Sequence, residues 1–140
     1  MRADDQMAVL RRLIEAINRQ ELARVAPEVI APGFVRHDLA GTWPGVRGER
    51  GVVDLVGSLQ AALPDLQFEI DDIFGAGDRV ALRFTMRGTH RAELLGRPAT
   101  GRPITVSGIN IYRFQDGKIA ETWQLADVAG LVHQLQDAGA

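Results

Sequence analysis

The hydrophobic period of this chain changes at Pro64, and that change limits the folds it can adopt. Before Pro64, apolar residues recur every three or four positions, which is the period of an amphipathic helix. After it, Leu66, Phe68 and Ile70 alternate with polar residues, which is the period of a strand with one buried face. Helices followed by strands predict an α+β fold, with the helices gathered against a curved antiparallel or mixed sheet.

Periods and chain breakers together predict the order of the elements. We expect a first helix that runs to about residue 20, with Asp4 and Asp5 as candidate N-caps. A short second helix is expected over 21–25 and stops near Pro27, and a third helix ends before Pro64. Residues 40–48 contain Gly41, Pro44, Gly45 and Gly48 and are expected to form a loop. The expected strands cover 66–71, 79–87, 104–114 and 119–126, and a short helix follows over 127–136.

Composition excludes several classes of protein. The 140 residues fit one domain, 1–140, and the net charge of −2 with interspersed signs argues against a nucleic-acid partner. The chain has no cysteine, which excludes disulfides, thiolate nucleophiles and cysteine metal sites. No apolar run is long enough to span a membrane, and residues 1–5 do not resemble a signal peptide. We therefore expect a cytoplasmic protein without a membrane partner.

A curled sheet closed by helices forms a cone whose interior is a natural ligand pocket. We expect substrate-binding residues among the apolar and aromatic side chains that would face this interior: Phe34, Trp43, Phe84, Met86, Tyr112 and Thr122. Such a wall suits a small apolar molecule, either aromatic or polyketide. Trp123 either lines the interior or covers the convex face of the sheet in a dimer.

Several short strings, in order along nearly the whole chain, resemble the SnoaL-like polyketide cyclases. They are Phe34-Val35-Arg36-His37-Asp38, Pro64-Asp65-Leu66, Gly88-Thr89-His90, Pro98-Ala99-Thr100-Gly101-Arg102, Tyr112-Arg113-Phe114 and the run from Asp116 to Trp123. The resemblance implies an NTF2-like cone fold, usually a homodimer or larger. It also implies ring closure by intramolecular aldol condensation without cofactor or metal.

The same resemblance implies where the catalytic groups lie. Ring-closing members carry a His and an Asp on the last two strands, and the matching positions here are Asn110 and Gln124. Amides hydrogen-bond a carbonyl or enolate oxygen but do not exchange protons near neutral pH. The two amides share a face if the Asp116-Gly117 hairpin has a bulged three-residue loop with Phe114 opposite Lys118. Under a two-residue turn Phe114 opposes Ile119 and the amides separate, so we favour the bulged loop.

Two histidines are candidates for proton transfer. His90 lies in phase with Val80 to Met86, so it is either a catalytic residue on the pocket wall or a hydrogen-bonded residue at a strand end. His37 is either a pocket base or a rim residue beside a turn-capping Asp38. The spacing of the histidines argues against a metal site.

Other acidic and basic residues fit structural roles better. Asp127 is expected to cap the last helix, and Glu121 to lie on the outer sheet face near Arg113. Arg83 and Arg87 are expected on that same face.

These observations leave three hypotheses open. The first is a cofactor-independent cyclase, isomerase or lyase, in which Asn110 and Gln124 polarise oxygens and His90 or His37 moves the proton. The second is an epoxide hydrolase-like enzyme, which would need an inward carboxylate beside an arginine. The third is a non-catalytic binding or accessory protein, which fits two amides at acid and base positions.

Overall fold

The computed structural model describes residues 1–43 and 45–136, so Pro44 of the expected loop and the end of the predicted 1–140 span lie outside the described residues. The helices are α1 (Ala3–Asn18), α2 (Leu22–Val29), α3 (Gly48–Ala62) and α4 (Val128–Gln136). The strands are β1 (Ile30–Asp38), β2 (Val46–Arg47), β3 (Gln67–Ala76), β4 (Arg79–Thr89), β5 (Pro103–Gln115) and β6 (Lys118–Ala126).

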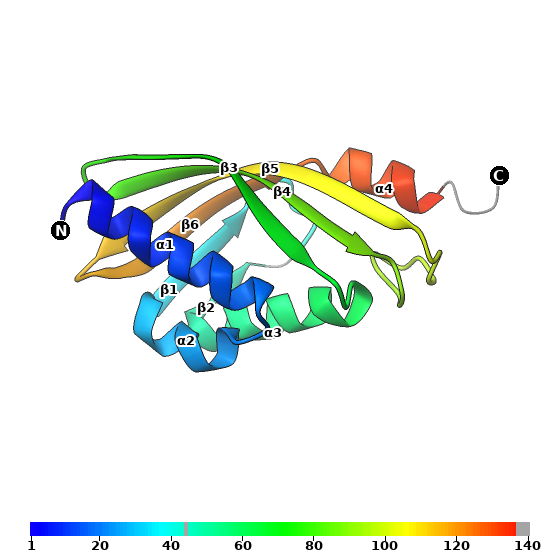
Figure 1. Ribbon diagram of the computed structural model, residues 1–140, viewed down its shortest axis with the longest axis horizontal. Helices are drawn as coiled ribbons and strands as arrows, with labels where there is room; N and C mark the ends of the chain where they lie inside the picture. The colour runs from blue at the N-terminus through cyan, green and yellow to red at the C-terminus, as the bar shows by residue number, and fades with distance from the viewer. Residues whose placement is uncertain (44, 137–140) are drawn as a thin grey trace.

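The strands form one mixed, curved sheet in the order β2-β1-β6-β5-β4-β3. The β1–β6 pair is parallel and the other pairs are antiparallel. Figure 1 shows α1, α2 and α3 together on one side of the sheet, with α4 beside the first half of β5, where Gln134 bonds to Thr105. The predicted α+β cone is confirmed.

Alternation along β4 and β5 decides which side chains face the helices. Val80, Leu82 and Phe84 are buried, while Arg83 and Arg87 between and beyond them are exposed, as expected. A Cβ added to Gly108 of β5 would lie 2.6 Å from Cζ of Phe84. The glycine therefore lets this ring lie across β5 and form the floor of the interior.

Three local predictions about the first half of the chain are wrong. Helix α1 begins at Ala3, so Asp4 and Asp5 lie in its first turn, where they favour the helix dipole but are not N-caps. Helix α2 continues through Pro27, because the proline falls in its last turn and removes only one backbone donor while Val29 stays buried. Within the predicted loop 40–48, Val46 and Arg47 pair with β1 as strand β2.

The β5–β6 hairpin has an unexpected register. Asp116 and Gly117 have φ of 52° and 80°, as in the two-residue turns that match strand twist. Phe114 opposes Ile119, so the predicted pairing with Lys118 is wrong. The register then shifts between Arg113 and Phe114, because both Ile119 and Ala120 are buried and form a bulge in β6. This bulge pairs Asn110 with Gln124, so the two amides share a face as predicted.

Candidate functional site: an apolar cavity with one polar end

The concave side of the sheet encloses a cavity of about 120 Å³. Helices α1 and α3 and the inner faces of β1 and β3–β6 supply its wall, and Val128 and Leu131 of α4 contribute at one end. All six residues predicted to bind substrate line it: Phe34, Trp43, Phe84, Met86, Tyr112 and Thr122. The wall is therefore mainly aliphatic and aromatic, as an apolar ligand requires.

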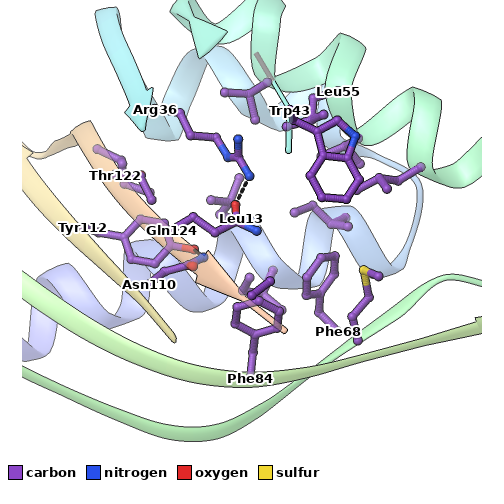
Figure 2. A pocket seen from close by; sticks show the side chains of 18 of the residues that line it. Leu13, Arg36, Trp43, Leu55, Phe68, Phe84, Asn110, Tyr112, Thr122 and Gln124 are labelled. Carbon is purple, nitrogen blue, oxygen red and sulfur yellow. Dashed lines mark hydrogen bonds between the residues drawn. The ribbon is translucent and has the colours of Figure 1, made fainter. Parts of the chain in front are cut away.

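Polar side chains gather at one part of this wall. Asn110, Tyr112, Thr122 and Gln124 project from β5 and β6, and Figure 2 shows Gln124 and Asn110 near the guanidinium of Arg36, with Phe84 and Phe68 beyond them. We call Arg36 and these four residues the polar end of the cavity.

Tyr112 is positioned as a hydrogen-bond donor. Nδ2 of Asn110 donates to its hydroxyl oxygen at 2.9 Å, which leaves the phenolic proton for another acceptor. Burial raises the pKa of Tyr112, and the hydrogen bond from Asn110 and the charge of Arg36 oppose this shift without reversing it. The phenol therefore stays protonated at neutral pH. Nδ2 of Asn110 also keeps a second hydrogen, so two donors lie side by side.

Arg36 is the site residue that sequence reasoning missed. Its Nη2 donates a hydrogen bond to Oε1 of Gln124, across the β1–β6 pair (Figure 2). Burial lowers the pKa of Arg36, while Asp38 and Tyr112 act in the opposite direction. A signal was available, since Arg36 follows Phe34 by two positions on an extended segment and so shares its inward face.

His90 is fully buried but does not line the cavity. Strand β4 ends at Thr89, so the alternation that would have aimed His90 at the interior stops one residue too early. Its Nδ1 accepts a hydrogen bond from the backbone N–H of Thr100 at 3.2 Å, and its backbone bonds to Arg102 and Gly101. In this position His90 ties the 90–102 segment to the end of β4.

His37 also lies away from the cavity, on the outer face of the sheet. Its Nε2 is 2.6 Å from Oε2 of Glu121, and its ring stacks on Trp123 with centroids 5.6 Å apart. Arg113 donates to the other oxygen of Glu121 at 3.1 Å, which agrees with the outer position expected for both residues. Asp38 accepts from the backbone N–H of Trp43 at 2.7 Å and is the turn-capping residue of this pair. The structure thus brings neither predicted histidine to Asn110 and Gln124.

Glu121 gives a testable dependence of stability on pH. Two hydrogen bonds lower the pKa of Glu121 below its ordinary value, and the one from His37 has a larger effect than the one from Arg113. A carboxylate with a lowered pKa in the folded state stabilises the protein above its unfolded pKa of about 4.3, and this contribution disappears as the pH falls through the folded value. We expect Glu121→Gln to lower the melting temperature at pH 7 and to converge with the wild type in acid.

Circular dichroism melts between pH 2 and 8 measure this difference, with Glu93→Gln, at an exposed position of the 90–102 segment, as the control. A melting-temperature gap between wild type and Glu121→Gln that persists unchanged at the acid end would contradict the assignment.

The described residues hold no group of three or more His, Asp or Glu that could bind a metal ion. None of the helices among them is long and apolar enough to cross a membrane. Asp127 accepts from the backbone N–H of Gly130 at 2.9 Å and caps α4, as expected.

A mixed sheet curved around an apolar cavity, with helices on its concave side, defines the NTF2-like cone fold. Within that fold, the chain belongs to the SnoaL-like polyketide cyclase family, whose model matches residues 7–135.

Known relatives agree with this assignment. Aklanonic acid methyl ester cyclase DnrD from Streptomyces peucetius is 29% identical over 140 residues, covering 93% of this chain and 90% of that protein. Among solved structures, IdmH from Streptomyces antibioticus, a candidate polyketide cyclase, is 33% identical with a TM-score of 0.82, covering 94% of this chain and 98% of that one. AclR from Streptomyces galilaeus, a candidate hydroxylase, is 29% identical with a TM-score of 0.84, and the match covers 96% of this chain and 98% of that one.

Proposed function

We propose that this protein is a cofactor-independent enzyme of the cyclase type, acting on a small apolar molecule that carries a carbonyl group. One observation carries the proposal: Tyr112 and Asn110 present two hydrogen-bond donors at the polar end of an otherwise apolar cavity. Donors fixed in a water-poor site stabilise the negative charge that develops on a carbonyl oxygen during enolisation or aldol addition. The remaining apolar wall would hold the carbon skeleton in a folded conformation.

The cavity volume limits the ligand. About 120 Å³ is similar to engineered cavities that hold a single benzene ring. A second hollow is lined by α3 and residues 93–95, and it shares Trp43, Leu55 and Leu59 with this cavity. A multi-ring substrate would therefore have to displace some of these shared side chains and extend into that hollow.

A non-catalytic binding function is the second candidate, and one observation favours it. No Asp, Glu or His is among the described residues that line the cavity, so carboxylate or imidazole proton transfer has no residue there. The same observation argues against an epoxide hydrolase, whose water must be activated by an inward carboxylate.

Incubation with aklanonic acid methyl ester, the compound named for the curated relatives, tests the proposal. We expect conversion to an isomer of equal mass and different chromatographic retention, since an intramolecular aldol closure adds and removes no atoms. Simple aryl 1,5-diketones, which are smaller than a multi-ring substrate, serve as second substrates. Recovery of every compound unchanged, together with co-purification of an unmodified metabolite, would support binding instead of catalysis.

We also propose that the protein is a homodimer joined through the outer sheet face. Five apolar side chains there, the outer stripe, are Phe74, Ile109, Ile111, Trp123 and Leu125. Ile109 faces Leu125 and Ile111 faces Trp123 across the β5–β6 pair. Ion pairs such as Arg83–Asp72 at 2.8 Å neutralise charges beside the stripe. A second copy would cover this apolar surface without burying an unpaired charge.

A further inference from the structure

Two hollows in this fold share part of their wall. The inner cavity has a volume of about 120 Å³ and the second hollow about 420 Å³, and Trp43, Leu55 and Leu59 line both of them. All three side chains are half-buried and pack against the hydrophobic core. A ligand that extends from the cavity into the hollow therefore has to pass these three side chains, which we call the shared wall.

Trp43 is held in the shared wall by the turn that follows β1. Its backbone N–H donates to Oδ2 of Asp38 at 2.7 Å, and the backbone N–H of Gly41 donates to the backbone oxygen of Asp38 at 3.1 Å. Figure 2 shows the indole of Trp43 near Leu55, with Tyr112 on the far side of the cavity. A ligand whose oxygen is bound at the polar end therefore directs its other end toward the indole.

The second hollow can accept an apolar group. Val46 and Leu94 are buried in its wall and Leu95 is half-buried, whereas its exposed lining residues are polar or acidic: Asp54, Ser58 and Glu93. A mainly apolar lining with a few polar groups is typical of a small-molecule site. The hollow thus suits an apolar tail of a ligand.

Trp43 has the largest side chain of the shared wall. Leu55 and Leu59 lie one turn apart on α3 and have short branched side chains, whereas an indole covers a much larger area. Because the cavity has about the volume that holds one benzene ring, a single ring fills the space between the polar end and the indole. We infer that Trp43 is a specificity-determining residue that limits ligand length, and that without its indole the second hollow becomes the subsite for an apolar tail. The inference rests on the proposed function, which places the ligand oxygen at the polar end.

Binding of 1-phenylethanone and its para-alkyl derivatives tests this inference, because the alkyl tail leaves the ring opposite the carbonyl. Isothermal titration calorimetry measures the dissociation constants. From the para-ethyl to the para-butyl ketone, we expect the affinity of the wild type to rise by less than about twofold, since the longer tail meets the indole. In Trp43→Ala we expect it to rise about tenfold, since each fully buried methylene contributes about fourfold.

Two further variants locate the tail. In the double variant Trp43→Ala, Ser58→Phe, a phenyl group placed in the second hollow should abolish the gain, and a gain that persisted would exclude this hollow as the subsite. Trp123→Ala removes the chain's other tryptophan, which stacks on His37 at the outer face, and should keep the wild-type profile. If Trp123→Ala gained as much as Trp43→Ala, the inference would be overturned.

The shortest ketone separates failure of this inference from failure of the proposed function. Absence of 1-phenylethanone binding from both the wild type and Trp43→Ala would overturn the proposed function and the inference with it. If 1-phenylethanone binds but the wild type also gains with tail length, or Trp43→Ala does not, the role of Trp43 is overturned while the proposed function stands. Trp43→Leu keeps an apolar side chain and should show an intermediate gain, so it decides the question if Trp43→Ala fails to fold.

Discussion

Asn110→Leu is expected to lower kcat for ring closure by about 100-fold to 1000-fold while changing KM little, the usual effect of removing one donor from an oxyanion site. The Asn110 amide supplies a hydrogen to the carbonyl oxygen and also orients the Tyr112 hydroxyl at 2.9 Å. Leucine has nearly the same shape, so the cavity wall is kept. Both interactions strengthen as charge develops, which places the loss in kcat.

Stability measurements separate this effect from damage to the fold. Asn110 is 7% exposed and its Oδ1 has no partner among the described residues, so leucine removes one unsatisfied buried atom while depriving Tyr112 of its bond. These changes offset each other to within about 1 kcal/mol of unfolding free energy, measured by urea denaturation. Ser107→Ala, on the exposed face of the same strand, is the matched control. Full turnover by Asn110→Leu would exclude the proposed role.

We expect the wild type to be a dimer and the double variant Ile109→Lys, Leu125→Lys to be monomeric. Ile109 and Leu125 are directly opposed within the outer stripe and are 55% and 53% exposed. Two lysines from each copy would meet across a two-fold interface and bring four like charges together. Sedimentation velocity measures the change, and circular dichroism shows whether each chain stays folded.

Leu39→Lys provides the control for this prediction, because Leu39 is equally apolar and exposed but lies beyond the end of β1. We expect it to remain dimeric. A wild type that sediments as a monomer at every concentration, or a double variant that still sediments as a dimer, would exclude the outer stripe as the interface.

Much of the fold could be predicted from the sequence because burial enforces periodicity. The switch at Pro64 separates three helices from four strands, and each predicted strand overlaps an observed one. Strand β1 is different: its run from Ile30 to Asp38 contains Pro32 and Gly33, and its parallel pairing with β6 joins segments far apart in the chain. Long-range pairing of this kind leaves little local signal in a sequence.

The site was predictable only in part, for two physical reasons. A bulge at Ala120, invisible in the apolar pattern, sets the face that Gln124 occupies. The histidines drew attention because of their chemistry, whereas side-chain direction placed His37 outside and took His90 off the cavity wall. Arg36 was overlooked because a charged side chain is expected at the surface, although its phase with Phe34 placed it inside.

Infrared difference spectroscopy of 1-phenylbutan-1-one carrying a ¹³C-labelled carbonyl tests the central claim most directly, since hydrogen bonding lowers the carbonyl stretching frequency. For ligand bound to the wild type, we predict a frequency below that in hexane, and a partial return toward the hexane value in Asn110→Leu. A bound carbonyl that absorbs at the hexane frequency in the wild type would show that the polar end of the cavity does not engage it, and would contradict the account.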